Sequence, residues 1–203
     1  SVDLENRYII EDDYDSEFRY AGRPIPSLQG MDKGDSVIYL STFSKSLMPS
    51  LRIAYMVLPN VLLERYKDAF IHYASTVPRL DQHILARFMA DGHFSRHLNK
   101  MRKVYKRKLQ TLTETLVPYA PHVSFSGDEA GMHIIVTVHT GESEQMLTTA
   151  AEKVGIRLYG LNSYRTAPIL GEPSFLIGFG GLSVHSITDA INNLMRAWGI
   201  RKT

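Results

Sequence analysis

The sequence has no cysteine among its 203 residues, so it can build neither a disulfide framework nor a thiolate metal site. That absence suits a cytoplasmic protein. Charges of the two signs nearly cancel, with 23 lysines and arginines against 21 aspartates and glutamates. The resulting net charge of +2 favours neither nucleic acid nor an acidic partner for the chain as a whole. The hydrophobic fraction of 44% is typical of a globular protein with a substantial core.

Long hydrophobic runs are missing as well. The longest apolar run, residues 175–182, is interrupted by three glycines. It is much shorter than the roughly 20 residues that a membrane-spanning helix needs. The first seven residues (SVDLENR) are mostly polar and do not resemble a signal peptide. We therefore expect a soluble cytoplasmic protein that does not use a membrane as a partner.

Strand-like and helix-like patterns alternate along the chain and predict an α/β fold. The first part contains apolar β-branched runs, and its helices are predicted to start near Pro59 and Pro78. A boundary near residues 78–92 divides the chain into domains 1–92 and 93–203, the second a compact α+β domain. The predicted strands are 8–14, 37–40, 52–58, 132–138, 157–159 and 175–179, and the predicted helices include 94–117, 144–154 and 187–198, with an irregular loop at 163–173.

The stretch 37–56 carries the clearest functional signal. Its apolar run stops at a cluster of Ser and Thr, presents the single lysine Lys45, and resumes as a strand after Pro49. Ligands of open α/β sheets bind where the strands end. A partly desolvated lysine there can lose its proton and form an imine with an aldehyde. The alternative is a solvated loop lysine without a ligand.

A second stretch, residues 8–15, supplies partners for such an aldehyde. If it is a strand, Asp12 and Tyr14 share one face while Asp13 takes the other. Pyridoxal 5′-phosphate needs a lysine for its aldehyde, a carboxylate for its ring nitrogen and donors for its phosphate. Lys45 and Asp12 match the first two, Tyr14 can steady the ring hydroxyl, and Thr42, Ser44 and Arg52 can hold the phosphate. The alternative for the second stretch is an acidic turn after a strand.

Residues 9–18 (IIEDDYDSEF) and 42–55 (TFSKSLMPSLRIAY) resemble fold-type I aminotransferases. Within that superfamily they are most similar to the aminotransferase-like domain of MocR-type, GntR-family transcription regulators. The resemblance implies the C-terminal part of a large cofactor domain, three-layered with a mostly parallel sheet, followed by a small α+β domain. It also makes Lys45 the Schiff-base lysine, Asp12 the partner of the pyridine nitrogen and Tyr14 the partner of the ring hydroxyl. Arg52, Thr42 and Ser44 would bind the phosphate.

The same resemblance implies a function in regulation. In this family the cofactor domain senses a small amino-acid or amine effector, acts as a homodimer and follows a winged-helix domain that binds DNA. An effector-binding arginine of the family falls at Ser163 here, which leaves Arg165 as the candidate for the effector carboxylate. The winged helix and the first half of the cofactor domain have no counterpart in these residues. We therefore expect the C-terminal part of a longer protein, with an incomplete cofactor site.

Two alternatives to the sensor function are kept. In the first, the chain is part of a true aminotransferase, which is a transferase acting on amino acids. In the second, the chain binds no cofactor by itself.

Elsewhere, the strongly basic helix 94–117 is better explained as a solvated face than as a nucleic-acid surface, because no aromatic residues interleave with its charges. His93 and His97 are spaced i, i+4 but lack the carboxylate partner of zinc helices, so we expect no metal site. No Ser-His-Asp arrangement can be recognised from sequence alone.

Overall fold

The computed structural model describes residues 7–23, 25–166 and 171–203. The chain divides into two compact units. The first contains the residues up to Glu17 together with Gly22–Lys100, and the second contains Phe18–Ala21 together with Met101–Thr203. The units therefore divide inside the long helix expected at 94–117, whereas the domain boundary at residues 92 and 93 stays a prediction.

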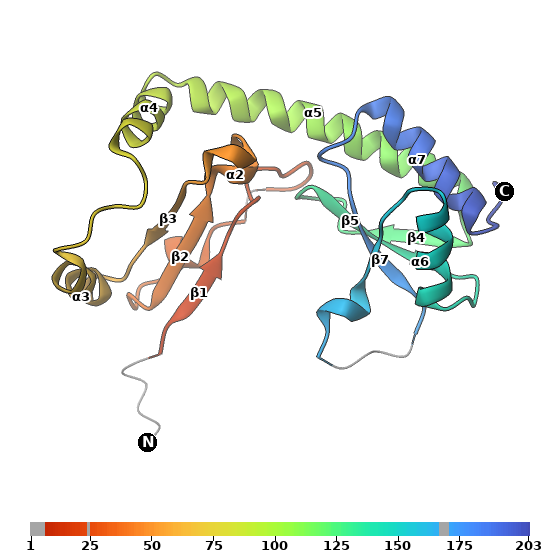
Figure 1. Ribbon diagram of the computed structural model, residues 1–203, viewed down its shortest axis with the longest axis horizontal. Coiled ribbons are helices and arrows are strands. Elements are labelled where there is room, and N and C mark those ends of the chain that lie inside the picture. The colour runs from red at the N-terminus through yellow and green to blue at the C-terminus, as the bar shows by residue number, and fades with distance from the viewer. Residues whose placement is uncertain (1–6, 24, 167–170) are drawn as a thin grey trace. The chain divides into compact units, whose positions relative to one another are not determined.

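The first unit is built on a three-stranded sheet in the order β1-β2-β3 (Figure 1). Its strands are β1 (Ile9–Asp12), β2 (Val37–Thr42) and β3 (Ala54–Val57). β1 runs parallel to β2, whereas β3 is antiparallel to it. Asp12 is paired with Leu40 and Thr42 with Ala54. The ends of β1 and β2 and the start of β3 therefore lie at one edge of the sheet, which we call the strand-end edge.

Short helical segments, two longer helices and the first part of a third complete this unit. Carboxylates tie its loops to the sheet. Glu11 of β1 accepts the backbone N–H groups of Leu28 and Gln29 at 2.8 and 2.9 Å, which anchors a one-turn helix beside the strand. Asp32 accepts three backbone N–H groups in the loop before β2, and these bonds, chiefly the one from Ser36, lower the pKa of its carboxyl group. The helical segments are α1 (Leu28–Met31), α2 (Phe43–Ser46), η1 (Pro49–Leu51), α3 (Asn60–Phe70), α4 (Arg79–Ala90) and α5 (His93–Leu116).

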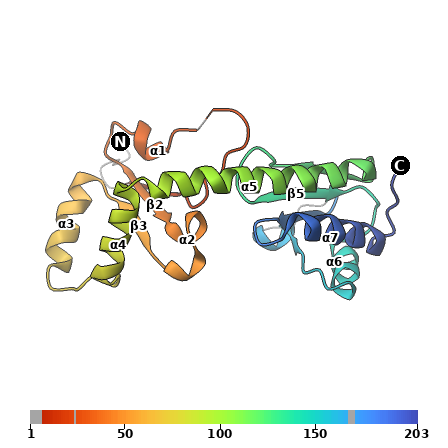
Figure 2. The ribbon, with the colours of Figure 1, turned by 90° about the horizontal axis from the view of Figure 1, so that it is seen from above.

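The second unit holds most of the buried core. Its sheet has the order β4-β5-β7-β6, and all neighbouring strands are antiparallel. Burial alternates strictly along β5, where Ile134, Val136 and Val138 are buried and the residues between them are half-buried. The buried face packs against three helices, and Figure 2 shows α7 between α5 and α6. The elements are β4 (Val123–Ser126), β5 (His133–Val138), α6 (Glu144–Lys153), β6 (Tyr159–Gly160), η3 (Leu161–Tyr164), β7 (Ser174–Gly178) and α7 (Val184–Ala197), with η2 (Val117–Tyr119) between α5 and β4.

The structure confirms the predicted α/β class, with a mixed first sheet and an antiparallel second one. Strand β4 was not predicted, and the strand expected at 157–159 is only Tyr159–Gly160. The reason is that β4 has only four residues between the turn-forming Pro121 and Gly127, so its local signal is short and cross-strand pairing with β5 decides its conformation. Part of the irregular loop expected at 163–173 lies outside the described residues. Among the helices that the structure describes, none has the length and apolar character needed to cross a bilayer.

Candidate cofactor-binding edge

The structure brings the predicted cofactor-binding residues of the first unit to the strand-end edge. Asp12 is the last residue of β1, and Thr42 is the last residue of the neighbouring parallel strand β2. Lys45 follows on α2, and Arg52 lies two residues before β3. Parallel strands end at the same edge of a sheet, so residues separated by about 30 positions in sequence gather there. Tyr14 lies just beyond β1 at the same edge.

Lys45 was predicted to lie in a loop, but the structure places it on the short helix α2. Thr42 caps this helix, because its hydroxyl oxygen accepts the backbone N–H of Ser44 at 3.1 Å. The same hydroxyl donates to the carbonyl oxygen of Ile53 at 3.1 Å and lies 3.0 Å from the Ser44 hydroxyl. The cap therefore fixes where the helix begins and hence the position from which the exposed Lys45 side chain extends.

Arg52 closes the segment between β2 and β3. Its φ of 51° and ψ of 33° place it in the left-handed region, which an arginine rarely adopts. The next residue, Ile53, accepts a 3.0 Å hydrogen bond from the backbone N–H of Phe43, so the segment is closed at its base. The Arg52 side chain is exposed and makes no ion pair with any residue that the structure describes. Backbone strain at this position is consistent with a functional constraint on the guanidinium.

Adjacent aspartates at the end of β1 have different surroundings. Asp13 accepts hydrogen bonds from the backbone N–H of Ser16 at 3.2 Å, from the Ser16 hydroxyl at 2.7 Å and from the Tyr39 hydroxyl at 2.8 Å. Asp12 is exposed and has no hydrogen bond within the described part of the chain. The two side chains therefore differ in their surroundings, whereas the role of Asp12 toward a cofactor stays a prediction. Asp13 serves the fold, and Asp12 is free to meet a ligand.

This difference predicts opposite responses to mutation. Asp13→Ala removes the acceptor of the half-buried Tyr39 hydroxyl and should destabilise the β1–β2 pair by about 1–3 kcal/mol. Asp12→Ala should change the stability of the same strand pair by less than about 0.5 kcal/mol. Native-state hydrogen exchange of the β2 backbone amides measures both values. Equal effects of the two substitutions would contradict the division of roles.

Phenol groups at this edge keep their protons. The pKa of Tyr14 is raised by the negative charge of Asp15, by partial burial and by the charge of Asp12. The pKa of Tyr39 is raised mainly by burial and further by its hydrogen bond to Asp13. Tyr14 can therefore act as a hydrogen-bond donor. The influence of Asp12 on the pKa of Tyr14 also indicates that the carboxylate and the phenol are electrostatic neighbours.

An aromatic group lines the first unit beside α2, and sequence analysis missed it. The rings of Phe43 and Tyr55 have centroids 5.3 Å apart, and Phe94 meets Phe43 edge-on at 5.9 Å. Tyr39 lies 6.2 Å from Tyr55. These contacts hold α2 against the sheet. The only sequence signal was the presence of three aromatic residues in 37–56, which ordinary core packing explains equally well.

Arg165 belongs to the second unit. It follows η3, its side chain is exposed, and it lines a cavity of about 250 Å³ together with Glu144, Glu172 and Asn162. Its role toward an effector stays a prediction. In the described part of the chain no three histidine, aspartate or glutamate side chains are grouped to hold a metal. The Nδ1 of His93 lies 3.0 Å from the Nη2 of Arg96.

Comparison with known proteins gives the family. The model of "Aminotransferase class I and II" matches residues 6–192, nearly the whole chain. The chain superposes with a TM-score of 0.82 on a kynurenine aminotransferase from Pyrococcus horikoshii, solved with PMP and its substrate and product. The two are 26% identical, over 94% of this chain and 47% of that one.

The relatives include transcriptional regulators. The chain is 42% identical to the HTH-type transcriptional regulator YdeL of Bacillus subtilis, over 95% of this chain and 42% of that protein. It is 32% identical to the probable rhizopine catabolism regulatory protein MocR of Rhizobium meliloti, over 94% of this chain and 39% of that protein. The chain thus spans about two fifths of these relatives. The resemblance to MocR-type regulators is confirmed, and the chain belongs to the aminotransferase class I and II family.

Proposed function

We propose that this chain is the C-terminal part of the cofactor- and effector-binding domain of a MocR-type transcription regulator. Its strand-end edge would bind pyridoxal 5′-phosphate, and a small amino acid or amine would be the effector. The observation that carries the proposal is the convergence of Asp12 and Lys45 at the ends of adjacent parallel strands. The regulatory part rests on relatives that are HTH-type regulators and are more similar in sequence than the aminotransferases.

The residues present fit this cofactor chemically. Lys45, Asp12 and Arg52 are exposed, and none makes an ion pair inside the described chain, so each charge is available to a ligand. Uncompensated opposite charges at one edge suit a molecule that carries an anionic phosphate and a basic ring nitrogen. When bound, pyridoxal 5′-phosphate supplies an electrophilic aldehyde and an electron sink.

Each side chain has a distinct task in that fit. Lys45 would bond to the aldehyde carbon once its amine has lost a proton, and the Asp12 carboxylate would hold the proton on the ring nitrogen. Tyr14, protonated because its pKa is raised, would donate to the ring oxygen. Arg52 would supply a two-pronged guanidinium to the phosphate, with Thr42 and Ser44 as hydroxyl donors. Arg165 would meet the carboxylate of the effector.

The test is to locate the bound cofactor. The purified chain is mixed with pyridoxal 5′-phosphate, reduced with borohydride to fix any lysine adduct, digested and mapped by mass spectrometry. We expect the adduct at Lys45 at cofactor concentrations where other lysines stay unmodified. Labelling spread over exposed lysines, Lys33 included, would refute a built site at the strand-end edge.

A second measurement separates sensor from enzyme. In the longer protein, a regulator should change its DNA affinity when the effector binds and should turn over amino acids slowly. The rival function, a true aminotransferase, is favoured by the kynurenine aminotransferase likeness. Transamination of common amino acids by the longer protein at an ordinary enzymatic rate of about 10 per second would support that rival.

A further inference from the structure

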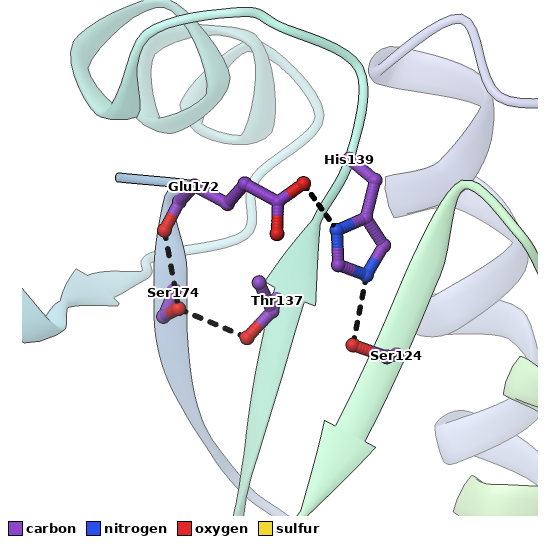
Figure 3. Close-up of polar contacts among 5 residues, drawn as sticks. All are labelled: Ser124, Thr137, His139, Glu172 and Ser174. Carbon is purple, nitrogen blue, oxygen red and sulfur yellow. Dashed lines mark hydrogen bonds and ion pairs between the residues drawn. The ribbon is translucent and has the colours of Figure 1, made fainter. Parts of the chain in front are cut away.

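The half-exposed face of the second sheet carries a polar network across three adjacent strands (Figure 3). Ser124 on β4 is paired with Thr137 on β5, and Thr137 is paired with Ser174 on β7. His139 directly follows β5, and Glu172 lies just before β7. All of these residues belong to the second unit, whereas the strand-end edge belongs to the first.

The central contacts run from a serine through a histidine to a carboxylate. The Ser124 Oγ lies 2.8 Å from the Nε2 of His139, and the Nδ1 of His139 lies 2.7 Å from the Oε1 of Glu172. The carboxylate can only accept, so the neutral imidazole carries its proton on Nδ1 and offers Nε2 as the acceptor of the Ser124 hydroxyl. Serine, histidine and acid thus stand in the order and at the distances of an acyl-transfer triad.

The sheet holds each member in place through its backbone. The N–H of His139 donates to the carbonyl oxygen of His122 at 2.8 Å, and the N–H of Val138 donates to the carbonyl oxygen of Pro173 at 2.9 Å. The Ser174 hydroxyl lies 2.9 Å from the Thr137 hydroxyl and 3.3 Å from the Glu172 carbonyl oxygen. Ser124 therefore lies on a strand, and His139 and Glu172 lie within two residues of a strand end, so that strand pairing fixes the backbone on which a preorganised site depends.

The edge position of β4 supplies a candidate donor for a developing negative charge. Hydrogen-bonded and non-bonded pairs alternate along an antiparallel ladder. Since the N–H of His139 donates to the carbonyl oxygen of His122 on the β4 side, Ser124 directs its N–H toward β5 and Phe125 directs its N–H away from it. β4 is an edge strand of the described sheet, so this N–H faces no further strand. The N–H that follows the nucleophile is a recurrent oxyanion donor.

We propose that Ser124, His139 and Glu172 form an esterase-like acyl-transfer site for short-chain carboxylic esters. Ser124 Oγ attacks the ester carbonyl, its proton moves to Nε2 of His139, and the carbonyl oxygen faces the Phe125 N–H. The C–O bond to the alcohol then breaks, and the alcohol leaves with the proton from Nε2. A water molecule next attacks the acyl-serine, gives its proton to Nε2 and releases the carboxylic acid as that proton returns to Ser124.

The exposure of the serine bears on the substrate class, and the contacts of each side chain define its role. Ser124 is exposed on an open strand rather than enclosed, which favours short acyl groups. Ser124 is the nucleophile and His139 the general base. Glu172 touches only the imidazole and acts as a positioning residue, because it holds the ring and stabilises the imidazolium that forms.

The test measures the reactivity of individual serines. The purified chain is treated with an alkyl fluorophosphonate, and modification at each serine is followed over time by peptide mass spectrometry. Ser126 is the matched control, because it is exposed and lies on the same face of the same strand, and it makes no hydrogen bond to a histidine in the described part of the chain. Ser124 should react about 10²-fold faster than Ser126, the usual contribution of a positioned base. Hydrolysis of p-nitrophenyl acetate should fall to background in Ser124→Ala and stay unchanged in Ser126→Ala.

Variants of the other members decide the mechanism. His139→Gln should bring the reactivity of Ser124 down to that of Ser126. Glu172→Gln should slow it about 10-fold, with the melting temperature unchanged and with recovery of the rate in Glu172→Asp. Equal reactivity of Ser124 and Ser126, or a Ser124 rate that does not depend on His139, would overturn the proposal. Modification of Ser124 without any Ser124-dependent ester hydrolysis would overturn it as well.

Discussion

Phe175→Ala is expected to cost about 3–5 kcal/mol of the unfolding free energy of the second unit. Phe175 is fully buried on β7, its ring centroid lies 5.4 Å from that of Trp198, and it is paired with the buried Val136. The loss combines the transfer free energy of a phenyl ring with the cavity that remains. A loss of this size is a large fraction of the stability of a typical domain.

The chain offers a built-in probe for this experiment. Trp198 is its single tryptophan, lies in the same core and donates from Nε1 to the carbonyl oxygen of Leu147 at 2.9 Å. Urea unfolding followed by tryptophan fluorescence therefore reports on the second unit alone. Phe125→Ala, at a half-buried position on the edge strand β4, is the control and should cost less than half as much. Equal losses would show that the core does not concentrate around Phe175.

Lys45→Ala should abolish the lysine adduct with pyridoxal 5′-phosphate and the near-visible absorption band that accompanies it. Lys45→Arg should abolish them too, although it keeps the positive charge, because a guanidinium stays protonated and forms no imine. Lys33→Ala is the matched control. It removes an exposed lysine of the same unit at the opposite end of β2, and it should leave the adduct intact.

Substitution of Asp12 should weaken binding without removing the reacting amine. Asp12→Asn deletes the charge that holds the proton on the ring nitrogen, and a charge-assisted hydrogen bond contributes about 1.5–3 kcal/mol. We expect a dissociation constant raised about 10- to 100-fold, measured by titrating the absorption band. An unchanged constant in Asp12→Asn, together with a retained band in Lys45→Ala, would remove the cofactor from the strand-end edge.

Local signals in the sequence predicted much of the fold. Pro59 and Pro78 directly precede α3 and α4, and the 3.6-residue period of α5 placed its buried Leu109 and Leu112. The structure also places Lys45 just past the end of a strand, as predicted, because β-branched runs and Ser/Thr caps act over a few positions. Its side chain is exposed, however, and not partly desolvated as the ligand hypothesis assumed. Its helical setting was missed, since the cap of Thr42 depends on the carbonyl of Ile53 across the segment.

What the sequence by itself determined is the family, the α/β class and the residues of the strand-end edge, because those signals reside in contiguous stretches around Asp12 and Lys45. The tertiary structure alone decided which polar residues from separate stretches meet. Ser124, His139 and Glu172 are brought together by the register of three strands, one of which the sequence did not predict. Strand register is a long-range property of pairing, and the local propensities of Ser, His and Glu carry no information about it.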